Sequence, residues 1–175
     1  MTAPTGRAKE ESREGERLET ELQPGSGSWD PLFGAAASRR VGPWGFDLSL
    51  LYQLATEGDQ DAHRGDVFSY NAAASYRIMG AEDDHGHDGQ SHGEHSHMGV
   101  DLVLELNGEW RDKAEVNGQE DDNSGGNQLF LAPGVRASGQ GWAASLSTGV
   151  PVVDDLNGVQ VDPRWRVVGG LSVGF

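Results

Sequence analysis

Histidine and acidic side chains gather in one segment of this 175-residue chain, between residues 80 and 98. Five of the six histidines lie there, and four of them form two His-x-His pairs. Imidazole suits zinc, copper and nickel, and the intervening glycines and serines let several ligands approach one ion. The candidate metal ligands are His85, His87, His92, His95, His97, Asp83, Asp84, Asp88 and Glu94.

This His-rich segment predicts labile binding of Zn, Cu or Ni rather than a required cofactor, because a low-complexity tract fixes no coordination geometry. Only neutral imidazole binds a metal, so binding should weaken as the pH falls through about 6.5. The alternative is a solvated linker that carries no physiological metal. Composition alone leaves both interpretations open.

The rest of the chain offers no catalytic motif. It contains no nucleophile elbow, phosphate-binding loop or His-Glu metalloprotease motif, and His63 stands alone. The absence of cysteine excludes disulfides and thiolate metal sites. The net charge of −15 argues against nucleic acid as a partner. We therefore predict a protein that is not an enzyme.

Apolar residues recur at every second position from Trp29 onward, which is the period of a β-strand with one apolar face. The clearest case runs Trp44, Phe46, Leu48, Leu50, Tyr52, Leu54. Similar alternation runs through residues 68–78, 100–110, 129–137, 142–152 and 165–175, and Pro133 interrupts it in the third of these segments. Residues 29–40 form a weaker first strand whose faces the sequence does not assign. Strands of about 9–11 residues suit a bilayer, whereas soluble strands are nearer 5–6.

The predicted fold is all-β: an antiparallel up-and-down meander of about seven long strands, forming the C-terminal part of a transmembrane β-barrel. A hydrophobic content of only 35% agrees with a thin apolar surface around a polar interior. Aromatic residues toward both strand ends predict two interfacial girdles.

Connection lengths predict the orientation, since outer-membrane barrels have short periplasmic turns and longer outer loops. Residues 41–43 and 139–141 form tight turns, whereas 56–65, 113–126 and 154–163 are long and polar. We expect residues 1–28 to form a charged extracellular loop. Residues 29–175 then form a partial outer-membrane barrel, in which 79–99 is an unusually long His-rich periplasmic loop.

The polar face of the alternating strands predicts a pore lining. Mixed charge along a passage suits a path for polar solutes or ions. The alternative is that these residues pair across strands and stiffen the wall. The candidates are Asp47, Gln53, Asn71, Arg77, Asp101, Glu105, Asn107, Glu109, Arg111 and Arg136, with Arg164 and Arg166 near the outer mouth.

The last strand carries the candidate assembly signal. Val167, Leu171, Val173 and Phe175 alternate up to a terminal aromatic residue, and an edge strand with free N–H and C=O groups can pair with another edge. This pattern resembles the terminal strand that the barrel-assembly machinery reads, so that machinery and outer-membrane lipid are the expected partners.

Several stretches resemble one family of outer-membrane barrels, the putative transporters or "MetA-pathway of phenol degradation" proteins. They are GERLETE (15–21), QPGSGSWDP (23–31), FSYN (68–71), LELNGEW (104–110) and PVVDDLNG (151–158). The resemblance spans nearly the whole chain, but its motifs are architectural. It implies a barrel and a transport role, and it does not imply phenol chemistry.

Members of that family carry a signal peptide and several more strands before this point, which this chain lacks. Seven strands would leave two open edges, which lipid does not tolerate. We therefore expect a truncated protein of the bacterial outer membrane whose missing N-terminal strands are its partners. Two alternative functions stay open: a metal-binding surface or periplasmic module anchored by a barrel, and a soluble antiparallel β-protein.

Overall fold

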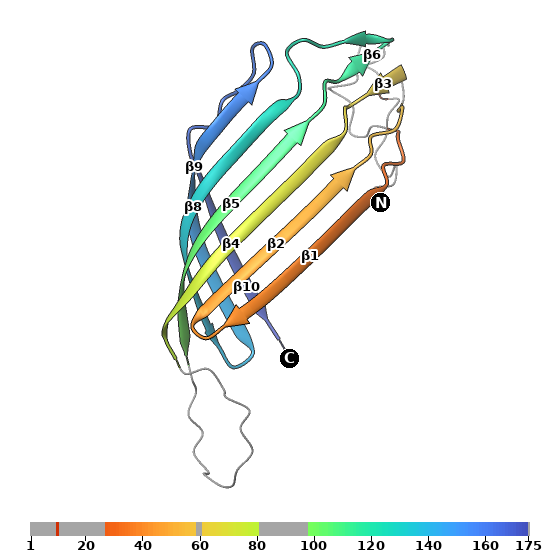
Figure 1. The fold of residues 1–175 in the computed structure, drawn as a ribbon. Coiled ribbons are helices and arrows are strands. Elements are labelled where there is room, and N and C mark those ends of the chain that lie inside the picture. The colour runs from red at the N-terminus through yellow and green to blue at the C-terminus, as the bar shows by residue number, and fades with distance from the viewer. Residues whose placement is uncertain (1–9, 11–26, 59–60, 81–97, 175) are drawn as a thin grey trace, which may run out of the picture.

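The computed structural model describes residues 10, 27–58, 61–80 and 98–174, and these residues form strands joined by turns and loops (Figure 1). The strands are β1 (Leu32–Val41), β2 (Trp44–Gln53), β3 (Ala62–His63), β4 (Val67–Met79), β5 (Gly99–Arg111), β6 (Glu115–Val116), β7 (Gln119–Glu120), β8 (Gly126–Gly139), β9 (Trp142–Leu156) and β10 (Arg166–Val173).

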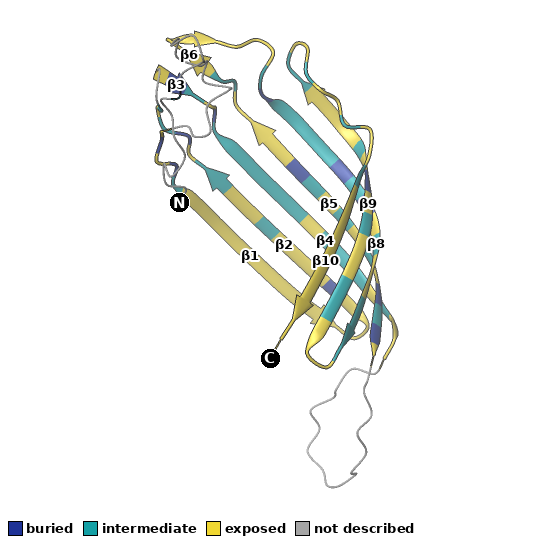
Figure 2. Cartoon of the chain, turned by 180° about the vertical axis from the view of Figure 1, so that it is seen from behind, coloured by how far each residue is buried: buried dark blue, intermediate teal, exposed yellow. Residues whose placement is uncertain are grey.

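The seven long strands form one antiparallel meander in the order β1-β2-β4-β5-β8-β9-β10. This confirms the prediction of an all-β, up-and-down fold with seven long strands. The sheet curls strongly, so that β10 crosses in front of the middle strands when the molecule is seen from behind (Figure 2). Within the described residues the sheet is open, with β1 and β10 as its two edges.

Each long strand presents one face to the inside of this trough and the other to the outside. Directly opposed residues of an antiparallel pair share a face, so the register identifies both faces. One row on the convex face runs Phe46–Ala74–Leu104–Pro133. The neighbouring row on the concave face runs Asp47–Ala73–Glu105–Ala132. The predicted separation of apolar and polar faces is therefore present in the sheet.

The sheet has almost no core of its own. Among the described residues, the buried apolar side chains are Ala55, Ala62, Phe130 and Ala132. The large apolar side chains instead lie exposed on the convex face, as Leu104 at 49% and Leu146 at 54% illustrate. The long strands are thus coloured largely as exposed or intermediate in Figure 2. No helix in the described part of the chain is long and apolar enough to cross a membrane.

The first strand is shorter than the segment predicted from the sequence, and its faces are now assigned. β1 begins at Leu32 rather than at Trp29 and extends to Val41. Its register with β2 pairs Phe33 with Tyr52 and Ser38 with Asp47. Phe33 therefore lies on the convex face, and Ser38 lies on the concave face.

Two bulges shift the alternation that the sequence suggested. Arg77 pairs with Asp101 whereas Met79 pairs with Val100, which makes Ile78 an extra residue in β4. In β9, Val152 is extra in the same way, because Pro151 pairs with Phe130 and Val153 pairs with Leu129. Ile78 and Val152, which the sequence placed in the regular apolar stripe, therefore have no directly opposed partner on the neighbouring strand. A bulged residue opposes no single partner, and the facing pattern changes parity beyond it.

The connections fall at two ends of the sheet, which we call the turn end and the loop end. The turn end holds the two-residue turns at 42–43 and 140–141, and β4 ends and β5 begins there. Gly42 and Gly141 have φ values of 55° and 74°, a region open to glycine without steric cost. The loop end holds the connections from β2 to β4, from β5 to β8 and from β9 to β10 (Figure 1).

The loop end is more ordered than a set of solvated loops. Residues from two of the predicted long loops form a second sheet in the order β3-β6-β7, with Ala62 paired to Val116 and His63 to Glu115. Asp66 accepts hydrogen bonds from the Ala55 amide at 2.9 Å and from the Tyr52 hydroxyl. These contacts fasten the loops to the end of β2.

Candidate functional site

The concave face of the sheet encloses the main cavities of the described structure. One cavity of about 830 Å³ lies toward the loop end, and a second of about 780 Å³ lies toward the turn end. Residues from all seven long strands line each of them. The curl of the sheet, rather than a cleft between two layers, therefore creates the space.

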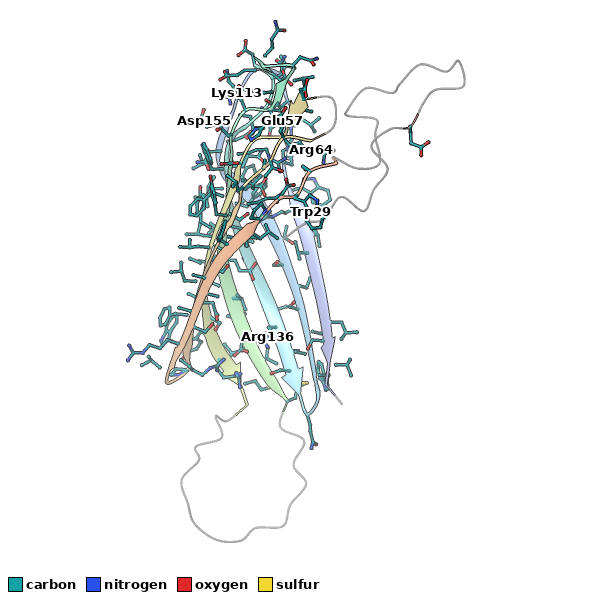
Figure 3. The ribbon with its side chains drawn as sticks, turned by 90° about the vertical axis from the view of Figure 1, so that its right-hand side faces the viewer. Trp29, Glu57, Arg64, Lys113, Arg136 and Asp155 are labelled. Atoms are coloured by element: carbon teal, nitrogen blue, oxygen red, sulfur yellow. The ribbon has the colours of Figure 1, made fainter. Side chains whose placement is uncertain are left out.

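The predicted pore-lining residues share this concave face. Seven of them line the two cavities: Asp47, Asn71, Asp101, Glu105, Asn107, Glu109 and Arg136. Figure 3 shows Arg136 on the inner side of the curved sheet. Of the other three, Arg77 binds Asp101, and Gln53 donates to Asp30 at 3.3 Å. Arg111 lines a third cavity at the loop end together with Glu109.

A largely buried ion pair on the concave face joins β4 to β5. The Arg77 guanidinium binds both carboxylate oxygens of Asp101, with a second contact from Nη2 to Oδ2 at 3.3 Å. The Asp101 side chain is only 4% exposed and that of Arg77 18% exposed. Arg136 of β8 directly opposes Asp101 on the other side. Near the turn end, the Asp101 carboxylate on β5 therefore lies between two strands, β4 and β8, that each carry an arginine directly opposite it.

Weaker polar contacts continue along the same face toward the loop end. Ser38 donates to Asp47 at 2.6 Å, Asn71 donates to Ser49 at 3.3 Å, and Gln128 donates to Asp154 at 2.9 Å. Each contact joins neighbouring strands, so polar side chains brace the wall as well as line it. Both sequence interpretations, lining and bracing, thus describe the same residues.

Two residues of the concave face meet in a way that the sequence did not predict. Arg166 pairs with Gly149 near the middle of β9, so it lies deeper in the trough than the mouth position expected for it. Its guanidinium carbon lies 4.1 Å from the ring centroid of Phe130. Phe130 belongs to the predicted strand at 129–137 but was not assigned a role. Only the register between β8, β9 and β10 reveals that these two side chains meet.

Charged side chains at the loop end form a separate group around Lys113 (Figure 3). The Lys113 ammonium donates to Asp122 at 2.7 Å and to Glu120 at 3.4 Å. The hydrogen bond with Asp122 is the main cause that raises the pKa of Lys113, and the same bond lowers the pKa of Asp122. The pKa of another aspartate, Asp162, is shifted upward instead, because Asp162 shares a hydrogen bond with a second acid, Asp154.

The predicted metal ligands all lie in 83–97, outside the described residues. That segment joins the end of β4 at Met79 to the start of β5 at Gly99, at the turn end. Elsewhere in the described chain, no group of three or more His, Asp or Glu side chains is placed to hold a metal ion. The metal-binding prediction therefore concerns the His-rich segment alone.

The described part of the candidate assembly signal lies on the convex face of β10. Val167, Leu171 and Val173 oppose Thr148, Ala144 and Trp142 of β9. All three are well exposed, with Leu171 at 75%. Phe175 lies outside the described residues. The other side of β10 is a sheet edge within the described structure.

Comparison of the chain with models of protein families, with curated proteins and with solved structures gives no match.

Proposed function

We propose that the chain is the C-terminal part of a bacterial outer-membrane β-barrel whose complete form is a pore or transporter for small solutes. The observation that carries the proposal is the inverted distribution of side chains in the sheet. The convex face holds exposed Leu, Val, Phe and Trp, while the concave face holds Asp, Glu, Arg, Asn and Ser around two cavities. A barrel wall in lipid requires this arrangement.

Aromatic residues on the convex face support a bilayer as the surrounding medium. At the loop end, Phe33, Tyr52, Phe68 and Trp110 oppose one another in a continuous row across four strands. At the turn end, the rings of Trp44 and Tyr76 meet edge to face with centroids 4.9 Å apart. Amphipathic rings prefer the two membrane interfaces, and the apolar middle of the strands lies between these two groups.

The strand directions indicate what would close the wall. Six antiparallel steps separate β1 from β10, so both edge strands run from the loop end to the turn end. Pairing the edges directly would make a parallel junction, as would a second copy inserted in the same orientation. An odd number of further strands makes every neighbour antiparallel, as in the even-stranded barrels of single chains. We therefore take further N-terminal strands of the same protein as the missing partner.

A soluble antiparallel β-protein is the less favoured alternative. It would have to keep the convex face in water, where contiguous apolar patches of more than a few hundred Å² are rare for a monomer. No second layer covers that face within the described residues (Figure 1). The exposed stripe spans all seven long strands, which favours lipid as its partner.

The test is reconstitution of the protein, with whatever strands its gene encodes upstream, into planar lipid bilayers. We expect stepwise conductance that persists in different salts, because the concave face carries both signs of charge. A protein that inserts into bilayers yet passes no current for ions or small solutes would contradict a pore. A protein that partitions into buffer without detergent and unfolds cooperatively there would instead support the soluble alternative.

A metal-binding role is a second candidate, favoured by the concentration of five histidines in one connection at the turn end. In this proposal the segment collects Zn, Cu or Ni and the barrel anchors it, on the periplasmic side in the orientation expected above. Deletion of residues 83–97 should remove zinc binding and leave conductance unchanged. Equal zinc binding with and without the segment would exclude this role.

A further inference from the structure

Arg166 has an unusual position among the cations of the concave face. Arg77 binds Asp101 and Arg111 binds Glu109 at 3.0 Å, whereas no hydrogen bond or ion pair joins Arg166 to any described residue. Its guanidinium lies instead on the ring of Phe130, at 4.1 Å from the centroid. Phe130 is only 5% exposed, so this ring is a firm support within the wall.

The surroundings of Arg166 leave its hydrogen-bonding capacity unused. The Nε atom is buried and has no acceptor among the described residues. A guanidinium carries five N–H donors, and a buried donor without a partner costs free energy. An acceptor that reaches this group from the cavity would therefore be bound more strongly than one that meets a hydrated arginine.

The backbone beneath Arg166 is shaped to hold its side chain. Gly149 lies directly opposite Arg166, and a Cβ added there would lie 3.0 Å from both Cγ and Nε of the arginine. The next strand contributes Ala132, whose Cβ would lie 3.6 Å from that same added atom. Small residues on β8 and β9 thus let the arginine lie flat against the wall with its guanidinium on Phe130.

Arg166 faces a space of suitable size and chemistry. The cavity of about 830 Å³ that it lines falls in the range of small-molecule sites. Its lining combines apolar side chains with amides, including Leu51, Val168, Asn71, Asn107 and Gln128. The nearby acids have other partners, because Glu109 pairs with Arg111 and Glu105 accepts from Asn107 at 3.5 Å. Arg166 is thus the cation of this cavity that is left for an incoming anion.

We propose that Arg166, supported by Phe130 and Gly149, binds the carboxylate of a small organic anion within the cavity at the loop end of the trough. A guanidinium matches a carboxylate through two parallel N–H···O bonds, and its planar face stacks on an aromatic ring at the same time. The inference rests on the proposed function, since it assigns a class of solute to the proposed passage. It depends on residues of β8, β9 and β10 and not on the strands that would close the wall.

The first test is titration calorimetry of the folded, detergent-solubilised protein with butyrate and with butyramide, its uncharged isostere. We expect butyrate to bind with one site and butyramide to bind about tenfold more weakly or worse, the ratio that a charged hydrogen-bonded pair supports. Arg166→Gln should lower butyrate binding to the level of butyramide. Arg64→Gln, which removes the same charge from an exposed loop residue that does not line this cavity, should leave butyrate binding unchanged.

Gly149→Ala supplies a variant that keeps the charge and moves the group. The new methyl would lie 3.0 Å from Cγ and Nε of Arg166 and would press the side chain away from Gly149, so butyrate binding should weaken although the guanidinium is still present. Far-ultraviolet circular dichroism should show the same β-sheet signature for all three variants. The proposal is overturned if butyrate and butyramide bind alike, if neither binds, or if Arg166→Gln binds butyrate as the parent protein does.

The calorimetric result and the conductance result separate the two proposals. A protein that conducts but does not distinguish butyrate from butyramide would keep the pore and lose the carboxylate site. A protein that binds butyrate through Arg166 but never conducts would keep the site and lose the pore. In a conducting protein, Arg166→Gln should also shift the reversal potential in a KCl gradient toward cation preference, whereas Arg64→Gln should shift it less.

Discussion

The ring of Tyr70 occupies the space that a side chain at Gly108 would need. A Cβ added to Gly108 would lie 2.1 Å from Cε2 of Tyr70, so the aromatic ring covers the glycine on the convex face. By crossing β5 at this point, the Tyr70 hydroxyl reaches Asn127 of β8 and donates to its Oδ1 at 2.9 Å. One side chain thus ties together three strands, and it can do so only because the middle strand carries a glycine.

Gly108→Ala should therefore destabilise the sheet by about 1–3 kcal/mol, the usual cost of forcing atoms into occupied space. Urea unfolding in lipid vesicles, followed by tryptophan fluorescence, measures the change. Gly169→Ala is the matched control on the same face, since its nearest atom would be the Ser145 carbonyl oxygen at 3.9 Å. Equal losses of unfolding free energy at both positions would show that the Tyr70 ring can move aside without destabilising the sheet.

Asp101→Ala should be far more damaging than Glu109→Ala, although both remove an acid from the concave face of β5. Asp101 is paired with Arg77 and is 4% exposed, so its loss removes the carboxylate that binds a largely buried guanidinium, at about 3–5 kcal/mol. The Glu109–Arg111 pair is about half exposed on both sides, and such pairs contribute about 1 kcal/mol or less. The same urea titration compares them, and similar midpoints would contradict this ranking.

Adjacent alanines on β4 test which face meets lipid. Ala74 shares the convex row of Phe46 and Leu104, whereas Ala73 lies between Asp47 and Glu105 on the concave face. In a bilayer, Ala74→Arg should cost about 2–4 kcal/mol, the penalty for arginine on the lipid side of a barrel near the midplane. Ala73→Arg should cost less, because two carboxylates flank it. If the convex face met water, Ala74→Arg would be as mild as other surface substitutions.

The connection between β9 and β10 should loosen as the pH rises through the raised pKa of Asp162. A hydrogen bond with Asp154 raises the pKa of Asp162 above its ordinary 3.8, so the folded loop holds a proton that the unfolded chain has already lost. The contribution of this hydrogen bond to the stability of the folded loop is complete below pH 3.8 and is lost as the pH rises through the raised pKa of Asp162. Hydrogen exchange across residues 157–165, corrected for intrinsic rates, should show this opening, and Asp162→Asn should abolish its pH dependence.

The connection between β5 and β8 should respond to pH in the opposite direction. The hydrogen bond with Lys113 lowers the pKa of Asp122 below 3.8. The contribution of this bond to the stability of the folded loop is therefore present above pH 3.8 and is lost as the pH falls through the lowered pKa. Hydrogen exchange across residues 112–125 should therefore slow as the pH rises from 2 to about 5, the range in which carboxyl groups titrate. A loop that responds like the β9–β10 connection would contradict the Lys113–Asp122 pairing.

The long strands could be predicted from the sequence because a half-exposed strand imposes a period of two on its own residues. The row Trp44, Phe46, Leu48, Leu50 needs no knowledge of its neighbours. The same holds for the concave positions such as Asp47 and Glu105, which follow once one face is identified. Bulges break this reasoning, because the extra residue at Ile78 or Val152 is specified by the partner strand and by no local pattern.

Contacts between distant strands could not be predicted for the same reason. Arg166 and Phe130 are separated by the whole of β9, and their meeting depends on two registers that the sequence does not state. The small sheet of β3, β6 and β7 was also missed, since strands of two residues have no measurable period. The packing of the Tyr70 ring over Gly108 was not predicted, because a glycine among alternating apolar residues only interrupts the pattern and does not reveal which side chain covers it.

The near absence of a core has a consequence for how this sequence can change over evolutionary time. In a globular protein each apolar side chain fits against others, so exchanging Leu for Val or Phe leaves a void or a collision. Side chains such as Leu104 and Leu146 have no such neighbours on the convex face, where half of their surface is free. Apolar residues can replace one another there at little cost, whereas Gly108, Asp101 and Gly149 sit against specific atoms. Lineages of such a wall should drift apart in residue identity while keeping their alternation and a few fixed glycines and charges.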